Sequence, residues 1–337
     1  DFTGKKIAAQ KGTDQEKIAH NEIKDSQVSS LNRLPESILA LKSGKVVGTI
    51  VEKPVGEAYL KQNPELEFAD VKFNEEKKPT CIAVPKNSPI LLKHLNQTID
   101  EVNNKNLIDK YMNQAAQDMQ DDGNFFTKYG SFFIKGIKNT ILISLVGVIL
   151  GSILGAFIAL LKINKFKPLS WLASIYIEFL RGTPMLVQVF IVFFGTTAAL
   201  GLDVSALICG TIALIINSSA YIAEIIRAGI NAVDKGQMEA ARSLGLNYIQ
   251  TMKSVIMPQA IKNILPALGN EFVTLIKESS IVSTIGVGEI MFNAQVVQGI
   301  SFDPFTPLIV AAVLYFILTF ALSRIMSLVE GRMKASD

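Results

Sequence analysis

The sequence contains very few residues of the kinds that carry metal or thiol chemistry. Among its 337 residues there are only two cysteines, two histidines and one tryptophan. Cys81 lies in a polar region and Cys209 in an apolar run, so a disulfide between them is not expected. His20 and His94 have no carboxylate or cysteine at ligand spacing. We therefore expect no metal site, no cofactor bound by this chain and no catalytic residues.

Neither sign of charge predominates, because the formal net charge is only +3. Acidic residues slightly outnumber basic ones in residues 1–122, whereas basic residues are in excess in 123–337, mostly between long apolar runs. That distribution is typical of loops that flank membrane spans, so no nucleic-acid partner is expected. The phosphate-binding pattern GxxxxGK[ST] is absent as well. ATP hydrolysis by this chain is therefore not expected.

Long apolar runs dominate the second part of the chain. A hydrocarbon core of about 30 Å needs roughly 20 apolar residues in a helix. Five stretches meet that requirement once polar interruptions are allowed. They lie near residues 137–161, 169–199, 205–227, 262–284 and 306–328. The sequence therefore predicts an all-α membrane domain with five spans, in contact with lipid.

The basic residues of the loops predict the orientation of these spans. Lys and Arg occur after the first span, between the third and fourth spans and in the tail, whereas the loops near Asp203 and over 289–303 have none. The positive-inside rule then places the tail (332–337) in the cytoplasm and the amino-terminal region on the outer side of the membrane. Residues 121–136, with alternating aromatics and lysines, predict a linker and a short interfacial helix before the first span.

Ionisable residues inside the spans are costly unless they are paired or face water. In the second span, Arg181, Gly182, Thr183 and Pro184 interrupt the helix, and a broken helix often lines a substrate route. An alternative is a kink held by an ion pair between Arg181 and Glu178. In the fourth span a polar stripe falls on one side of a helix. The stripe consists of Asn270, Glu271, Thr274, Lys277 and Glu278. Together with Arg181 it is the candidate translocation pathway.

A polar segment at about 234–258 separates the third and fourth spans and is too hydrophilic to insert. It contains EAARSLG and, shortly afterwards, VIMP. This segment resembles the EAA loop of ATP-binding-cassette importer permeases, in which a short helix docks into a groove of the ATPase subunit. The resemblance assigns the coupling role to Glu239, Ala240, Ala241 and Gly245. An ordinary amphipathic surface helix is the alternative.

Three further runs resemble the polar amino-acid branch of that family. They are FLRGTPMLVQ, AYIAEIIRAGINAVDKGQ and LIKESSIVSTIG. The resemblance covers the whole membrane part (137–331) and implies a type I importer permease. It also implies two copies of the chain in a homodimer, and a dimer of cytoplasmic ATPase subunits that bind ATP and Mg²⁺.

The first 120 residues predict an α/β domain. KKIAAQ and VVGTIV read as strands, each followed by a turn that opens a helix. The GT turn offers donors beside a helix N-terminus, where a carboxylate can bind. With QKGT and EKPVGEAYL, the region resembles the second lobe of type II periplasmic-binding-protein-like domains for polar amino acids. That resemblance implies that Gln10, Gly12, Thr13 and Glu52 contact the substrate. Alternatively, Thr13 only caps a helix and Glu52 is only solvated.

This resemblance covers only one of the two lobes, because a bilobal binder needs about twice as many residues as are found here. Residues 80–84 resemble the strand that returns through the hinge, and 89–119 the closing helices. Asp1 then falls close to the hinge, and we expect the natural polypeptide to continue upstream with the first lobe.

The function expected from these resemblances is import of polar amino acids, with glutamine or glutamate favoured. A binding domain fused to the permease suits a Gram-positive type of plasma membrane. The rival hypothesis is an amino-acid-gated ion channel, which should have a pore loop such as TVGYG and no ATPase-docking segment.

Overall fold

The computed structural model describes residues 2–71, 73, 81–111, 114 and 124–334. Contacts divide the chain into two compact units. The first comprises Asp1–Tyr129 and Gly299–Pro304, and the second comprises Gly130–Gln298 and Phe305–Asp337. The first unit contains a small sheet with helices, whereas the regular secondary structure among the described residues of the second unit is entirely helical.

The α/β unit is built on a three-stranded parallel sheet. Strand β1 (Lys6–Gln10) lies between β2 (Gln27–Leu31) and β3 (Gly48–Thr49). Its small and apolar residues Ile7, Ala8 and Ala9 are fully buried, as expected for the central strand of a parallel sheet. The helices of this unit are α1 (Asp14–Asn21), α2 (Leu34–Lys42), α3 (Lys53–Gln62) and α4 (Pro89–Asn104). The order of elements confirms the predicted alternation of strands and helices.

Some elements of this unit differ from the prediction. Strand β2 and helix α2 were not anticipated, because QVSSL is too polar to stand out as a strand. Residues 81–84 form no strand, contrary to the expected hinge strand at 80–84, and Thr80 lies outside the described residues. The predicted closing helices begin with α4, while 112–113 and 115–119 lie outside the described residues.

The helical unit follows the apolar runs of the sequence. Its elements are α6 (Phe125–Ile163) from Gly130 onward, α7 (Lys167–Gly182), α8 (Met185–Leu200), α9 (Ala206–Asn231), α10 (Lys235–Ser243), α11 (Tyr248–Thr251), a π-helical turn (Met252–Ile256), α12 (Met257–Glu278), a 3₁₀ turn (Ser279–Ile285), α13 (Ile290–Ser301) as far as Gln298, and α14 (Thr306–Lys334). Among the described residues, three helices are long and apolar enough to span a membrane. Two bent pairs raise the number to five if each pair is one span, which agrees with the five predicted spans.

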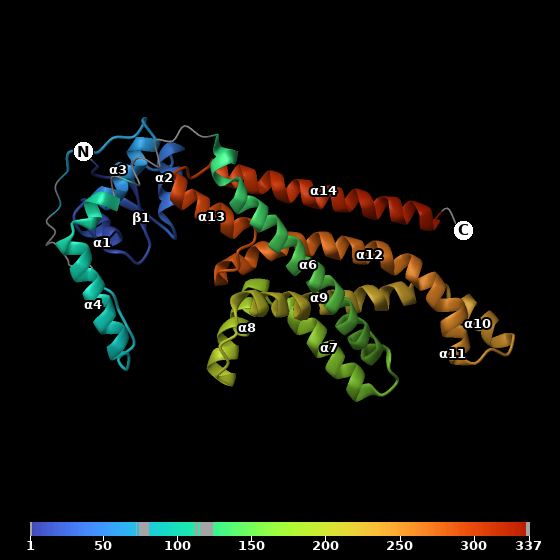
Figure 1. Ribbon diagram of the computed structural model, residues 1–337. Helices are drawn as coiled ribbons and strands as arrows, with labels where there is room; N and C mark the ends of the chain where they lie inside the picture. The colour runs from blue at the N-terminus through green and yellow to red at the C-terminus, as the bar shows by residue number, and fades with distance from the viewer. Residues whose placement is uncertain (1, 72, 74–80, 112–113, 115–123, 335–337) are drawn as a thin grey trace. The chain divides into compact units, whose positions relative to one another are not determined.

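Helix α9 is central to the packing of this unit, with α7, α8 and α12 against it and α14 against α12 (Figure 1). Helix α6 approaches α9 closely at Gly155, where an added Cβ would lie 2.8 Å from the Ser219 carbonyl oxygen. Such small-residue crossings are common between membrane helices because they let the backbones come together. At the ends of these helices, Lys162 Nζ lies 2.6 Å from Glu224 Oε1, and Arg227 binds the same carboxylate.

Three segments are more continuous than the sequence suggested. The expected interfacial helix at 121–136 is not separate from the first span, because α6 runs without a break from Phe125. The coupling segment continues from Tyr248 into the fourth span as one helical run to Ile285. The stretch 289–303, expected as a loop, contains α13.

Candidate functional site

The predicted break in the second span is present. Helices α7 and α8 meet at an angle of 108°, and Thr183 and Pro184 between them are extended (Figure 1). Pro184 has no backbone N–H to continue the ladder of α7, so the chain turns there. Arg181 stacks over the Tyr221 ring of α9 at 5.5 Å from the centroid. Among the described residues no ion pair joins Arg181 to Glu178, and the alternative of an ion-paired kink is wrong.

A buried amide cluster that was not singled out from the sequence lies at this break. Gln188 donates to the carbonyls of Leu180 and Thr183, and Asn217 donates to the oxygen of Gln188. Gln188 is the last residue of the FLRGTPMLVQ run. The available signal was therefore a polar side chain within an apolar half-helix.

The polar stripe of α12 is divided between two environments. Asn270 and Lys277 are exposed on the single chain, Glu271 is buried, and Thr274 and Glu278 are half-buried. An exposed amide and ammonium within a membrane span cannot face lipid at low cost. This surface therefore requires water or a further protein surface beside it. Among the described residues, no hydrogen bond or ion pair links Arg181 to the stripe.

Another buried carboxylate, Glu289, was missed by the sequence analysis. It precedes α13 and accepts hydrogen bonds from the backbone N–H groups of Met291 (2.9 Å) and Phe292 (2.6 Å), and from the Tyr315 hydroxyl. Asn139 of α6 donates to the neighbouring Gly288 carbonyl at 2.7 Å. These bonds tie α6 and α14 to the start of α13. A Glu directly before an apolar helical run was the available signal.

The predicted coupling segment consists of two capped helices. The Asp234 side chain accepts from Gly236 N–H at the start of α10, and Asn247 and Gln250 form a capping box at α11. The turn between them requires Gly245, whose φ is +85°. Glu239 and Ala240 are exposed, whereas Ala241 is buried. Helix α10 packs against the π-helical turn.

Large apolar side chains are exposed on this hydrophilic segment. Leu244 is 84% exposed and Ile249 is 75% exposed, and the Tyr248 ring between them is also exposed. Large apolar side chains exposed on an otherwise hydrophilic segment are typical of a protein–protein contact.

The π-helical turn after α11 is explained by Pro258, the last residue of the VIMP run. Pro258 has no N–H, so it cannot donate to the Ser254 carbonyl four residues earlier. The backbone instead widens, and Met257 N–H donates five residues back to the Met252 carbonyl. The side chain of Gln259 donates to the Val255 carbonyl at 2.9 Å. The helical run from the coupling segment into α12 is thereby preserved.

In the α/β unit, the predicted substrate-binding residues lie along one edge of the sheet. Parallel pairing of β1 with β3 brings together the ends that carry Gln10 and Glu52. Thr13 caps α1, donating to the Gln10 carbonyl at 2.6 Å and accepting from Glu16 N–H. Glu52 is exposed at the N-terminus of α3 and its side chain makes no cap bond. Carboxyl ends of parallel strands are the usual location of ligands in such folds.

The Gly12 amide at this edge is already engaged within the chain. It donates to Glu16 Oε2 at 2.7 Å, and Ser30 donates to the other oxygen of the same carboxylate. The Ser30 hydroxyl, followed by the Gly12 amide, lowers the pKa of Glu16. Glu16 was not identified from the sequence. Its carboxylate accepts the hydrogen bond of the Gly12 N–H, a group that was predicted to contact the substrate.

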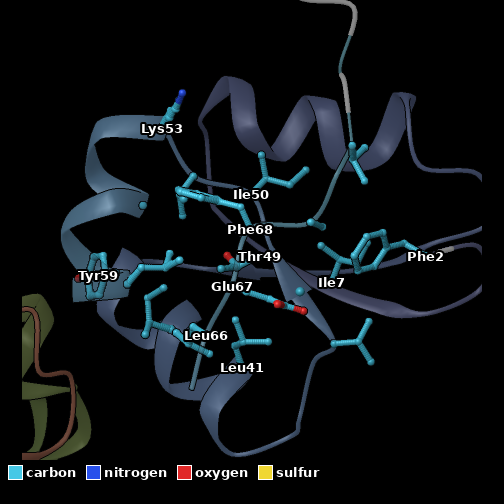
Figure 2. A pocket seen from close by; sticks show the side chains of 18 of the residues that line it. Phe2, Ile7, Leu41, Thr49, Ile50, Lys53, Tyr59, Leu66, Glu67 and Phe68 are labelled. Atoms are coloured by element: carbon cyan, nitrogen blue, oxygen red, sulfur yellow. The ribbon is translucent and has the colours of Figure 1, made fainter. Parts of the chain in front are cut away.

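A separate cavity of about 690 Å³ lies in the same unit (Figure 2). Its walls are mainly apolar and include Ile7, Leu41 and Phe68, as well as Tyr59, whose pKa is raised to about 12 by burial. The residues that line this cavity include none of the four predicted substrate contacts. The cavity is thus distinct from the polar edge of the sheet.

Comparison with known proteins covers the membrane part. The profile of a family described as "Binding-protein-dependent transport system inner membrane component" matches residues 147–335. The arginine transport system permease protein ArtQ of Bacillus subtilis (strain 168) is 44% identical over 61% of this chain and 94% of its own length. The putative glutamine transport system permease protein GlnP of Rickettsia bellii (strain RML369-C) is 42% identical over 61% and 94%.

A solved structure supports the same comparison. The crystal structure of an amino acid ABC transporter with histidines matches with a TM-score of 0.60 and 48% identity. The match covers 62% of this chain and 99% of that one. These similarities lend no support to the amino-acid-gated channel.

Proposed function

The chain belongs to the family of binding-protein-dependent transport system inner membrane components, and on that premise we propose that it is the permease subunit of an ATP-driven importer of polar amino acids. Support comes from relatives named as arginine and glutamine permeases and from the amino acid transporter of known structure. Glutamine or glutamate remains the favoured substrate, and arginine is the main alternative candidate because one relative is named as an arginine permease.

The single observation that carries a coupling role is the exposure of three large apolar side chains, Leu244, Tyr248 and Ile249, on the hydrophilic coupling segment. Glu239 and Ala240 belong to the same segment, and the helical run into α12 begins at Tyr248. We infer that a cytoplasmic ATPase subunit covers this surface, with ATP and Mg²⁺ bound by that partner. A force applied at α11 would then be transmitted along α12 to the polar stripe.

The translocation pathway is proposed to run past Arg181 and the α12 stripe. Asn270 and Lys277 are exposed on the single chain, and a second copy of the chain provides a surface that can enclose them away from lipid. Supporting this, the broken α7–α8 span places backbone polar groups at membrane depth, a common arrangement around transported solutes. The proposed assembly is a homodimer with two ATPase subunits.

The α/β unit is proposed to be one lobe of a fused extracellular solute-binding domain. Its parallel sheet and the polar edge formed by Gln10, Thr13 and Glu52 support that assignment. A docked, loaded domain would deliver substrate to the outward face of the spans. Fusion to the permease favours a Gram-positive type of plasma membrane, with the carboxyl terminus in the cytoplasm.

The coupling role is tested with Gly245→Pro and Glu239→Lys in the full-length protein with both lobes of its binding domain, reconstituted in nanodiscs with its ATPase partner. Proline cannot adopt the φ of +85° at Gly245, so the α10–α11 turn must change. We expect amino-acid binding to persist and ligand-stimulated ATP hydrolysis to be lost. Unchanged stimulated hydrolysis in both variants would remove the coupling role, and absence of uptake for any amino acid by the unmutated complex would contradict the importer.

A further inference from the structure

The break between α7 and α8 leaves backbone acceptors at membrane depth. The last carbonyls of any α-helix have no partner within the helix. In a hydrocarbon surrounding they must find other donors. At the end of α7, the Thr183 hydroxyl donates to the Phe179 carbonyl at 2.9 Å, which satisfies one of them. The next acceptors require a donor from outside α7.

That donor is the side-chain amide of Gln188, one turn into α8. Its Nε2 lies 2.7 Å from the Leu180 carbonyl oxygen, 3.1 Å from the Thr183 carbonyl oxygen and 2.9 Å from the Thr183 hydroxyl oxygen. A primary amide has two N–H groups, so one serves Leu180 and the other is shared by the two Thr183 oxygens. Leu180 and Thr183 flank the pair Arg181–Gly182. Gln188 therefore bridges the chain on both sides of Arg181.

The orientation of this amide is set from a third helix. Asn217 of α9 donates from Nδ2 to Gln188 Oε1 at 2.9 Å. Both side chains are buried, with Gln188 5% and Asn217 3% exposed. Because the oxygen of Gln188 is held by Asn217, its nitrogen must face α7. Asn217 Oδ1 is itself buried with no hydrogen-bond partner among the described residues.

We propose that Gln188 is a positioning residue that sets the direction in which α8 leaves α7 and so holds Arg181 at the break, with Asn217 orienting its amide. The proposal rests on the proposed function only for the role of Arg181 in the pathway. Gln188 itself need not touch the transported amino acid. Its effect on transport is exerted through the backbone on either side of Arg181.

The experiment measures the geometry of the break and transport in the same protein. Spin labels are attached at Leu172 on α7 and Phe194 on α8, both exposed, after Cys81 and Cys209 are replaced by alanine. Gln188→Met keeps the length of the side chain without polar atoms, and Gln188→Glu keeps its shape without N–H donors. We expect the interlabel distance distribution to shift or broaden in both variants. Uptake by the full complex should fall by about tenfold or more, equivalent to about 1.4 kcal/mol in the barrier.

Asn217→Leu separates positioning from general stability. It removes a buried acceptor that has no partner, Asn217 Oδ1, but it also leaves the buried Gln188 Oε1 without its donor, so the melting temperature should change little. We nevertheless expect a broadened label distance and reduced uptake. A residue with a merely structural role would lower uptake only in proportion to a fall in melting temperature.

An unchanged distance distribution in both Gln188 variants overturns the proposal, whatever their uptake. Arg181→Ala distinguishes a failure of the Gln188 proposal from a failure of the proposed pathway. If that variant transports normally, the pathway role of Arg181 fails, while the distance measurement still decides the role of Gln188.

Discussion

Truncation of Leu244 should weaken the binding of the ATPase subunit without destabilising the permease. Leu244 is 84% exposed and lies at the turn between α10 and α11. Because the side chain is so exposed on the isolated chain, Leu244→Ala should change the free energy of unfolding by less than about 0.5 kcal/mol. Any larger effect on assembly then reports a contact with a partner.

The magnitude follows from the area that a partner would cover. Replacing leucine with alanine removes one methine and two methyl carbons, and at about 0.8 kcal/mol for each buried carbon the loss is about 2 kcal/mol in total. That corresponds to a rise of about 30-fold in the Kd for the ATPase subunit. Ile249→Ala, at a side chain that is 75% exposed, should have a similar effect. The two losses should be roughly additive if the side chains enter separate parts of the groove.

The assay is a titration of nanodisc-embedded permease with the ATPase subunit, followed by fluorescence anisotropy. Leu328→Ala is the matched control, because Leu328 is 70% exposed but belongs to the apolar helix α14. We expect its Kd to equal that of the unmutated chain. Equal Kd values for Leu244→Ala, Ile249→Ala and the control would refute docking at this surface. An equal weakening by all three would show a nonspecific effect.

Two further predictions concern packing and charge. Gly155→Ala should destabilise the helical unit by about 1–3 kcal/mol, because the new methyl group meets the Ser219 carbonyl at 2.8 Å and Ile222 at 2.9 Å. Thermal unfolding in detergent measures this, with Gly195→Ala as control, since an added Cβ there meets no atom within 4 Å. Ser30→Ala should raise the pKa of Glu16, which the Ser30 hydroxyl lowers. A depressed carboxyl pKa stabilises the fold above the unfolded value of about 4.3 and loses that effect as the pH falls through the folded pKa. A carboxyl NMR titration with the same Glu16 midpoint in both proteins would contradict the assignment.

Much of the helical unit could be predicted from the sequence because hydropathy is a local property. A run such as residues 205–227 has to form a helix in a membrane whatever its neighbours are, since only helices satisfy their own backbone groups there. The break at Pro184 and the turn at Gly245 are equally local, because each depends on the covalent limits of one residue. The GT turn and the strand at residues 6–10 were found for the same reason.

The arrangement of polar groups around these elements could not be predicted, because it depends on residues that are distant in the chain. Asn217 reaches Gln188 from another helix, and Asn139 reaches Gly288 across 149 positions. Periodicity placed Asn270 and Glu271 on one side of a helix, but only packing decided that Glu271 is buried while Asn270 is exposed.

The sequence by itself determined that the chain has apolar spans, a broken second span and a hydrophilic segment between the third and fourth, since each follows from residue type and spacing. Only the tertiary structure decided which polar groups hold the break, that the Gly12 amide binds Glu16, and that Leu244 and Ile249 are uncovered. The physical reason is that hydrogen bonding and burial depend on which side chains meet after the helices have packed.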